Sequence, residues 1–312
     1  MSTTPERRVL LVTHALRRDA LSLAASVATR LIAAGVGVCA VPEDLAGTPL
    51  ERVVGVQVAD PTSGAAGCEL VCVLGGDGTI LRAAELSRGS QAPLLGVNLG
   101  HVGFLAEAER EDLDATVEHI LDRAYTVEER MTLDVTAHEN GRVVFRSWAL
   151  NEVTVEKASR ERMLELTVEI DGRPLSTWGC DGVVMATPTG STAYAFSAGG
   201  PVVWPDVEAL LLVPISAHAL FARPIVVGPQ SRLAVEVVPR TDAGGVVWCD
   251  GRRAVGLPPG ARIQVERSAD PVRLARLSTA PFTDRLVDKF DLPVHGWRGA
   301  ARRKLAEGTT TP

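Results

Sequence analysis

The sequence has 312 residues, of which 46% are hydrophobic and 22% are charged. This length and apolar content are enough to bury one large core or two smaller ones, which excludes an intrinsically disordered chain. Its 38 acidic residues outnumber its 32 lysines and arginines, and the resulting net charge of −6 offers no chain-wide attraction to nucleic acid or to an anionic bilayer.

The first 130 residues alternate between short β-branched runs and helical patterns. Apolar residues 9–12 follow Arg7 and Arg8, but this run is too brief for the core of a signal peptide, so we expect a cytoplasmic protein. The pattern predicts strands at 9–13, 36–41, 70–74 and 93–97 and helices at 18–34, 79–87 and 111–124. Because such alternation is typical of a parallel sheet covered by helices, we predict an α/β domain over residues 1–130.

From about residue 131 the pattern changes to short strands of alternating polarity. Strands are predicted at 132–137, 143–148, 152–155, 164–170, 182–186, 232–238, 246–249 and 262–266. Asp171-Gly172 and Asp250-Gly251 are typical of tight hairpins, since glycine tolerates the positive φ that these turns require. We therefore predict a second, mostly antiparallel all-β domain over residues 131–280.

The last segment, residues 281–312, contains a helical pattern at 283–290, and we expect it to return to the first domain. Its end is basic and is expected to be disordered; the basic residues are Arg298, Arg302, Arg303 and Lys304.

Two further classes of protein are disfavoured. The most apolar run, residues 207–215, falls well short of the ~20 residues that a membrane helix needs and contains Glu208 and Pro214. The cysteines are odd in number and scattered, which argues against a disulfide framework; they are Cys39, Cys68, Cys72, Cys180 and Cys249. Cys68 and Cys72 lack the spacing of a zinc knuckle, so we interpret them as buried apolar residues and predict no protein-held metal site.

The strongest motif is Gly75-Gly76-Asp77-Gly78-Thr79, which lies between a predicted buried strand and a helix. Glycines let the backbone N–H groups approach an oxyanion without obstruction, and the helix N-terminus favours negative charge. The motif therefore indicates a phosphate cradle, although an ordinary tight turn capped by Asp77 would use similar residues.

Asp77 favours a chemical role, because a carboxylate in an anion-binding loop would otherwise be repelled. It could accept a proton from a hydroxyl that attacks a phosphoryl group, or it could hold Mg²⁺. Arg82, five residues later, could contact phosphate or ribose oxygens, or could be a surface residue. The chain contains neither GxxxxGK[ST] nor an early GxGxxG, so a P-loop kinase and a standard Rossmann dehydrogenase lose support.

A second glycine-rich stretch, residues 96–104, follows the next predicted strand. In a parallel sheet both loops emerge at the same edge, where ligands bind in open α/β folds. Phe104 could stack on a base, but core packing is the better interpretation.

Two patterns in the predicted β domain are rich in polar groups. Asn151-Glu152 interrupts an apolar alternation and could bind hydroxyls or an amine. Residues 187–194 carry more hydroxyls than a helix cap requires, which suggests hydrogen bonds to a ligand. Within this stretch Tyr194 could stack on a base or lie on the core.

In these motifs the chain resembles the NAD kinase family along most of its length. Five motifs match in order: Gly-Gly-Asp-Gly-Thr at 75–79, Gly-Val-Asn-x-Gly-x-x-Gly-Phe-Leu at 96–105, Asn-Glu at 151–152, Asp-Gly at 181–182 and Thr-Pro-Thr-Gly-Ser-Thr-Ala-Tyr at 187–194. Residues 214–224 are similar to a later block of the family.

The resemblance implies that the chain phosphorylates the 2′-hydroxyl of the adenosine ribose of NAD to give NADP, with ATP or inorganic polyphosphate as donor. Asp77 would accept the hydroxyl proton, and the loop Gly75, Gly76, Gly78 and Thr79 would border the phosphates. Asp181 would reach the nicotinamide end. The remaining implied contacts to the dinucleotide are Arg82, Asn151, Glu152, Arg162, Thr192, Ala193, Tyr194 and Ser197.

The resemblance further implies Mg²⁺ bound with the donor, a cleft between the two domains, and a homo-oligomer, either a dimer or a tetramer. Many members carry a basic residue two positions before Asp-Gly, whereas Gly179 and Cys180 precede Asp181 here, so the preference between NAD and NADH stays open. Two alternatives also stay open: a diacylglycerol- or sphingosine-type lipid kinase that shares the Gly-Gly-Asp-Gly loop, and a non-catalytic dinucleotide sensor in which Asp77 only caps a helix.

Overall fold

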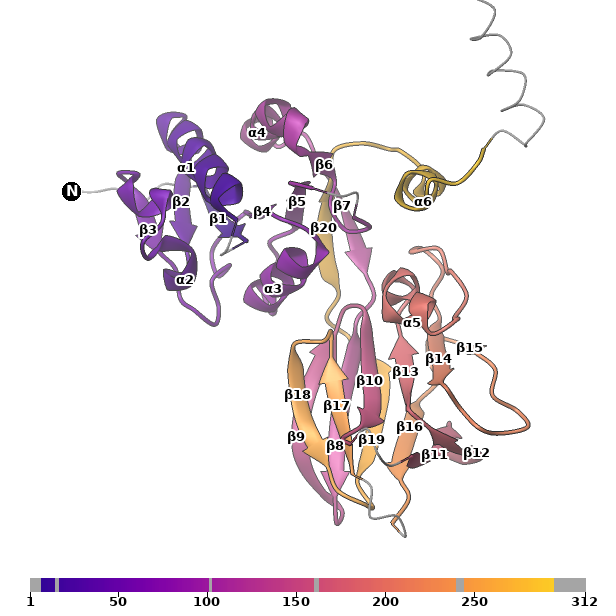
Figure 1. The fold of residues 1–312 in the computed structure, drawn as a ribbon. Helices are drawn as coiled ribbons and strands as arrows, with labels where there is room; N and C mark the ends of the chain where they lie inside the picture. The colour runs from indigo at the N-terminus through magenta and orange to yellow at the C-terminus, as the bar shows by residue number, and fades with distance from the viewer. Residues whose placement is uncertain (1–6, 15–16, 101–102, 160–162, 240–243, 295–312) are drawn as a thin grey trace, which may run out of the picture.

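The computed structural model describes residues 7–14, 17–100, 103–159, 163–239 and 244–294, which form an α/β domain and a β domain (Figure 1). Within these residues no helix is long and apolar enough to cross a membrane. The predicted basic stretch from residue 298 onward lies outside the described residues.

The first domain is built on an eight-stranded sheet of order β3-β2-β1-β4-β5-β20-β7, with β6 paired to β5. Its strands are β1 (Arg8–Thr13), β2 (Gly37–Ala40), β3 (Val56–Val58), β4 (Leu70–Leu74), β5 (Leu94–Asn98), β6 (Ala108–Glu109), β7 (Thr126–Arg130) and β20 (Val272–Arg276). The strands β1 to β6 and β20 pair in parallel, and β7 runs antiparallel to β20. The predicted α/β domain is confirmed, with one antiparallel strand at its edge.

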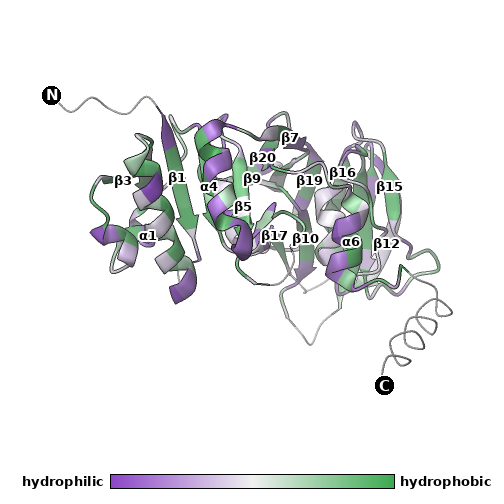
Figure 2. Ribbon diagram, turned by 90° about the horizontal axis from the view of Figure 1, so that it is seen from above, coloured by the Kyte–Doolittle hydropathy of each residue, from purple (hydrophilic) through white to green (hydrophobic). Residues whose placement is uncertain are grey.

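Helices cover both faces of this sheet. They are α1 (Arg18–Ala33), α2 (Pro42–Leu45), α3 (Asp77–Ser87) and α4 (Leu113–Asp122), with short 3-10 turns at Pro49–Arg52 and Arg110–Asp112. The helices α1 and α4 share one apolar cluster with the sheet, and α3 contributes to the cluster on the other face. The strands β1 and β4 are buried almost throughout, which explains their unbroken apolar sequence, and β1 and β5 are hydrophobic in Figure 2.

The second domain is a sandwich of two six-stranded antiparallel sheets, of orders β15-β14-β13-β10-β17-β18 and β12-β11-β16-β19-β8-β9. Its strands are β8 (Leu133–Glu139), β9 (Arg142–Ala149), β10 (Glu152–Lys157), β11 (Leu164–Ile170), β12 (Arg173–Cys180), β13 (Gly182–Ala186), β14 (Leu210–Ile215), β15 (Ile225–Val227), β16 (Leu233–Val237), β17 (Gly245–Cys249), β18 (Arg253–Leu257) and β19 (Arg262–Arg267). One apolar core, which includes the fully buried Trp178, lies between the sheets. The predicted all-β domain is confirmed.

Both predicted hairpin turns are present. Asp171 and Gly172 have φ of +53° and +74°, and Asp250 and Gly251 have φ of +52° and +64°. These left-handed values are the ones that tight hairpins require, and they explain the Asp-Gly pairs in the sequence.

The boundary predicted at residues 280 and 281 differs from the structure. The chain re-enters the first sheet already at β20, where Leu274 pairs with Leu94 of β5 and five residues pair with β7. The sequence of β20 alternates like its neighbours in the β domain, so nothing local indicates which sheet it joins. The helix α6 (Phe282–Phe290) follows and lies against both domains, since its Phe290 contacts Phe104 of the first and Phe196 of the second.

The five cysteines are all free thiols, and four of them are buried. Cys68, half-buried, lies beside Cys39 with 3.6 Å between the sulfurs, although Cys72 is nearer in sequence. Cys39 lies on β2 and Cys68 lies just before β4, so the fold brings together two thiols that are 29 positions apart in the sequence.

Candidate functional site

The glycine-rich loop 75–79 leaves the carboxyl end of β4 and starts α3 at Asp77, two residues earlier than predicted. A Cβ at Gly75 would lie 2.4 Å from the Thr79 hydroxyl, so this position accepts only glycine. A Cβ at Gly76 or Gly78 would meet nothing within 4 Å. The backbone at Gly76 and Gly78 therefore faces open space into which a ligand can come close.

A cavity of about 570 Å³ opens in front of this loop. Its polar lining is rich in cations: besides Gly76, Gly78, Thr79 and His14 it includes Arg17, Arg82 and Arg252. Arg252 belongs to the second domain and forms a 3.1 Å ion pair with Glu85 of α3. The predicted cleft between the domains is thus present, and guanidinium groups beside a helix N-terminus suit phosphate oxygens.

Arg82 is held firmly at the wall of this cavity. Its guanidinium donates to both carboxylate oxygens of Asp44, at 2.6 and 2.8 Å, and to the carbonyl of Thr13 at 2.7 Å. Asp44 is fully buried, and burial raises its pKa although the Arg82 cation opposes that shift. Arg82 is 16% exposed and is therefore not a solvated surface residue.

Asp77 is oriented by the second glycine-rich stretch. Its carboxylate accepts hydrogen bonds from the backbone N–H groups of Phe104 at 3.1 Å and Leu105 at 3.2 Å. A Cβ at Gly103 would lie 2.4 Å from Asp77 Oδ1, so the absence of a side chain there makes room for the carboxylate. The prediction that both loops meet at one edge of the sheet is confirmed.

Phe104 itself packs away from solvent. Its ring lies 6.0 Å from that of Phe282 and 5.9 Å from that of Phe290, and it is 9% exposed. This bears out core packing as the better interpretation.

Asn151 and Glu152 are held by a residue that we predicted only as a turn former. The buried Asp250 carboxylate accepts hydrogen bonds from the N–H groups of Leu150 at 2.9 Å, Asn151 at 2.7 Å and Glu152 at 3.3 Å. It also pairs with Arg253 at 2.9 Å. The one sequence signal for Asp250 is the Asp-Gly pair, which does not indicate contacts a hundred residues away.

Glu152 is a buried carboxyl group in an unusual environment. It is 8% exposed, and its Oε2 has no hydrogen-bond partner within the part of the chain that the structure describes. Burial and the neighbouring Asp250 carboxylate raise its pKa to about 8, while the backbone N–H of Tyr194 donates to it and opposes that shift. Such a group suits a ligand hydroxyl or amine that would supply the missing partner.

The hydroxyls of residues 187–192 serve the fold more than we predicted. The Thr187 hydroxyl donates to the carbonyl of Leu150 at 2.6 Å, and the Ser191 hydroxyl bridges the N–H and carbonyl of Val203 at 2.9 and 3.1 Å. Thr192 donates to the carbonyl of Thr189 at 3.3 Å. Their number is therefore explained by internal bonds and does not by itself indicate a ligand.

The partly exposed members of the same segment remain open to a ligand. Thr192 and Ala193 are half-buried, and Tyr194 and Ser197 of α5 (Tyr194–Ser197) are exposed. A Cβ at Gly190 would lie 2.0 Å from the carbonyl oxygen of Asn151, so this glycine brings the segment against the Asn151-Glu152 pair.

Asp181 lies between β12 and β13 with a cation beside it. Lys157 of β10 donates to its carboxylate at 2.5 Å and holds the pKa of Asp181 below its usual range. Asp181 thus has a cationic partner on a neighbouring strand, although no basic residue precedes it at positions 179 and 180.

The structure assembles the candidate residues in two groups that meet at one turn. Asp77, Arg82 and the glycine-rich loop form the first group, and residues 150–152, 181 and 192–197 form the second. The turn 250–253 joins them, because Asp250 holds residues 150–152 while Arg252 and Arg253 pair with Glu85 of α3. Arg162 lies outside the described residues.

Comparisons with known proteins agree with this arrangement. The ATP-NAD kinase N-terminal domain model matches residues 9–125, and the ATP-NAD kinase C-terminal domain model matches residues 150–277. NAD kinase 2 of Streptomyces coelicolor is 59% identical over 300 residues, which cover 96% of this chain and 99% of that protein.

Two solved structures share the fold. Yeast NADH kinase complexed with NADH gives a TM-score of 0.82 at 22% identity, covering 94% of this chain and 89% of that chain. An NAD kinase from Archaeoglobus fulgidus in complex with ATP gives a TM-score of 0.69 at 26% identity, covering 91% and 99%.

Proposed function

Since the chain belongs to the NAD kinase family and is a phosphotransferase, we propose that it moves the terminal phosphoryl group of ATP or inorganic polyphosphate to the 2′-hydroxyl of the adenosine ribose of NAD. The observation that carries this proposal is the position of Asp77. Its carboxylate is oriented by two backbone N–H groups and stands between Gly76 and Gly78, which line the cationic cavity between the domains.

The donor phosphates are expected in that cavity. Arg17, Arg82 and Arg252 supply positive charge, and the open backbone at Gly76 and Gly78 allows close approach. Arg17 is itself positioned, since it donates to the carbonyl of Leu99 at 2.6 Å. Groups fixed before the donor arrives need no reorganisation as charge develops on the transferred phosphoryl group.

The acceptor ribose is expected beside Asp77, on the side of the carboxylate away from the donor cavity. Asn151 and Glu152 would hold the dinucleotide, and Tyr194 and Ser197 would line its path toward Asp181. The hydroxyl oxygen forms the new P–O bond while its proton passes to the Asp77 carboxylate, and the donor leaves with the electrons of the broken P–O bond. The products are NADP and a donor shortened by one phosphate.

A divalent metal is expected to arrive with the donor. Mg²⁺ usually keeps several waters and is bound through substrate phosphates together with one or two carboxylates. When bound, Mg²⁺ neutralises charge on the donor phosphates. Asp77 is the acidic residue of the loop 75–79, and we assign its carboxylate to the proton rather than to the metal.

A panel of donors tests the proposal. Purified protein is incubated with NAD or NADH, Mg²⁺ and either ATP or polyphosphate, and NADP or NADPH is measured with an NADP-specific dehydrogenase. Product with at least one donor is expected. Saturable NAD binding without product from either donor would instead support a sensor, and phosphorylation of a diacylglycerol or sphingosine would support the lipid kinase.

We also expect a cytoplasmic homo-oligomer, a dimer or a tetramer. Leu220 and Phe221 are exposed on the segment after β14, where apolar side chains favour contact with another subunit. Light scattering coupled to size exclusion gives the mass of the assembly, and a monomer at micromolar concentration would contradict this expectation.

A further inference from the structure

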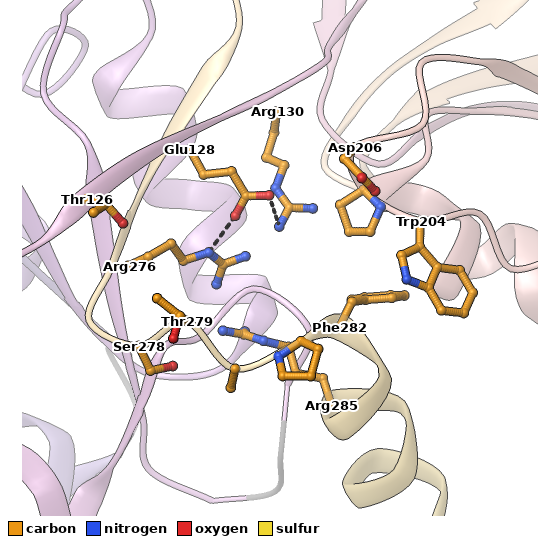
Figure 3. A pocket seen from close by; sticks show the side chains of 13 residues that line it. Thr126, Glu128, Arg130, Trp204, Asp206, Arg276, Ser278, Thr279, Phe282 and Arg285 are labelled. Atoms are coloured by element: carbon orange, nitrogen blue, oxygen red, sulfur yellow. Dashed lines mark hydrogen bonds and ion pairs between the residues drawn. The ribbon is translucent and has the colours of Figure 1, made fainter.

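A second cavity, of about 460 Å³, lies at the seam of the two domains and apart from the glycine-rich loop (Figure 3). Three segments line it: β7, the stretch from β20 into α6, and residues 204–206 of the second domain. Its walls combine the rings of Trp204 and Phe282 with three guanidinium groups, those of Arg130, Arg276 and Arg285.

The three arginines outnumber the buried or half-buried carboxylates that pair with them. Glu128 pairs with Arg130 at 2.9 Å and with Arg276 at 2.7 Å. Glu107, which is 1% exposed, accepts from Arg276 at 2.7 Å and from Arg285. Two buried or half-buried carboxylates thus face three cations, and the remaining acidic group at the cavity, Asp206, is exposed.

Arg130 is the least satisfied of the three. Its side chain is 4% exposed, and its Nε is buried without a hydrogen-bond partner within the described part of the chain. Burial and the nearby Arg276 and Arg285 cations lower its pKa to about 10, although Glu128 opposes the shift. A buried guanidinium with an unused donor beside an open cavity is costly unless a ligand completes its bonds.

The cavity is also connected to Asp77 through main-chain contacts. Arg285 donates to the carbonyl of Ala106 at 2.6 Å and to that of Phe104 at 3.4 Å. The N–H groups of Phe104 and Leu105 are the donors that orient the Asp77 carboxylate. A ligand that draws on Arg285 therefore acts on the segment that positions the catalytic carboxylate.

We propose that this seam cavity binds a small multivalent oxyanion, with phosphate or carboxylate groups, and that its occupancy adjusts the kinase through Arg285 and residues 104–106. Binding would supply the charge that the three arginines lack, and it would fix α6 between the domains. Planar guanidinium groups bind both oxyanion types in the same paired geometry. The binding half of the proposal is independent of the proposed function, and the regulatory half rests on it.

Calorimetric titration of the full chain with sodium pyrophosphate and, separately, with citrate tests the binding, at constant ionic strength set by KCl. Besides any anion binding in the donor cavity, a saturable site is expected that is weakened at least tenfold by Arg130→Gln and strengthened severalfold by Asp206→Asn, which removes the opposing carboxylate. Arg252→Gln, which alters the donor cavity, should leave this site unchanged. Citrate binding alone would identify a carboxylate ligand, and pyrophosphate binding alone a phosphate ligand.

The controls make the proposal easy to overturn. Loss of binding in Arg252→Gln with retention in Arg130→Gln would assign the anion to the donor cavity instead. Absence of any saturable binding would also overturn it. If Arg130→Gln does not fold, the exposed Asp206→Asn variant decides, because unchanged affinity there would place the anion elsewhere.

The regulatory half is tested by NADP formation at fixed free Mg²⁺ with and without the anion that binds. A change of at least twofold in kcat or in KM for NAD is expected in the wild type and is expected to vanish in Arg130→Gln. An equal change in both proteins would reject the link to Asp77, while the calorimetric result would still stand.

Discussion

Asp77 and Glu152 are two acidic side chains to which we assign roles in the proposed reaction, and the protein surrounds them in opposite ways. Asp77 lies among hydrogen-bond donors at a helix N-terminus, next to a cavity lined by arginines. Glu152 lies buried beside a second carboxylate, with one oxygen lacking a partner among the described residues. The α/β domain thus presents an accessible acceptor, and the β domain keeps a carboxyl group whose charge is costly until a ligand arrives.

The largest effect is expected from Asp77→Asn, which tests whether the Asp77 carboxylate accepts the hydroxyl proton. The amide keeps the size of the side chain but cannot take the hydroxyl proton, so kcat for NADP formation should fall by about 10²- to 10⁴-fold. NAD affinity, measured by calorimetry, should change less than about threefold.

Asp114→Asn is the matched control, because Asp114 also lies in the first turn of a helix but lines neither cavity. Its kcat should equal that of the wild type. A kcat for Asp77→Asn within threefold of the wild type would remove Asp77 from the proton transfer.

The next largest effect is expected from Asp250→Ala, which tests how the segment 150–152, with the buried Glu152, is held in place. Three backbone N–H groups and Arg253 would lose their acceptor, and the free energy of unfolding should fall by about 3–5 kcal/mol in urea titrations. Asp171→Ala is the control, since Asp171 occupies the same left-handed turn position with φ +53° but is exposed. Its loss should be about 1–2 kcal/mol, from turn strain and from the exposed bonds that its carboxylate accepts from the N–H of Arg232 and the hydroxyl of Ser231. Equal losses in the two variants would mean that the Asp250 network adds nothing.

The contrast between the surroundings of Asp77 and those of Glu152 also explains how much of the structure the sequence could predict. The glycines, the strand end and the helix start that form the Asp77 loop all lie within about five residues. The sequence therefore predicted this loop nearly in full. The strands β1, β2, β4 and β5 and the helices α1, α3 and α4 were also predicted, whereas the short or edge strands β3, β6 and β7 were not. The turn pairs Asp171-Gly172 and Asp250-Gly251 were likewise predictable, because their backbone conformation is set within two residues.

What the sequence could not predict depends on contacts between distant segments. Asp250 acts on residues 150–152, a hundred positions earlier, and Lys157 reaches Asp181 across paired strands. The strand β20 joins the first sheet although its alternating pattern resembles that of the second domain. Charge, burial and register across such distances decide these features, and no short motif encodes them.

A third, smaller effect concerns the pH dependence of stability. The folded pKa of Glu152 is about 8 and the unfolded value is about 4.3, so the folded protein holds one extra proton between these values. Its stability contribution is complete below about pH 4.3 and is lost as pH rises toward 8, at a slope on the order of 1.4 kcal/mol per pH unit.

Glu152→Gln, which does not titrate, isolates this contribution. From pH 5.5 to pH 7 the wild type should lose about 2 kcal/mol more than this variant in urea titrations. Asp250→Asn should shift the loss to lower pH, because removing the Asp250 charge lowers the pKa of Glu152. Parallel profiles for the wild type and Glu152→Gln would show that Glu152 titrates normally in the folded protein.

The smallest effect is expected from Tyr194→Ala, which tests whether the exposed side of α5, near Glu152, binds the dinucleotide. Tyr194 is 37% exposed, so truncation should change the free energy of unfolding by less than about 1 kcal/mol. Its backbone N–H still donates to Glu152 in the variant, and the Glu152 carboxyl group keeps that partner. The loss should therefore appear in NAD affinity, at about 5- to 10-fold, and Tyr194→Phe should restore most of it because the ring supplies the contact area. Equal NAD affinity in Tyr194→Ala and the wild type would place the dinucleotide away from α5. The residues around Asp77 would then have to bind it without those around Glu152.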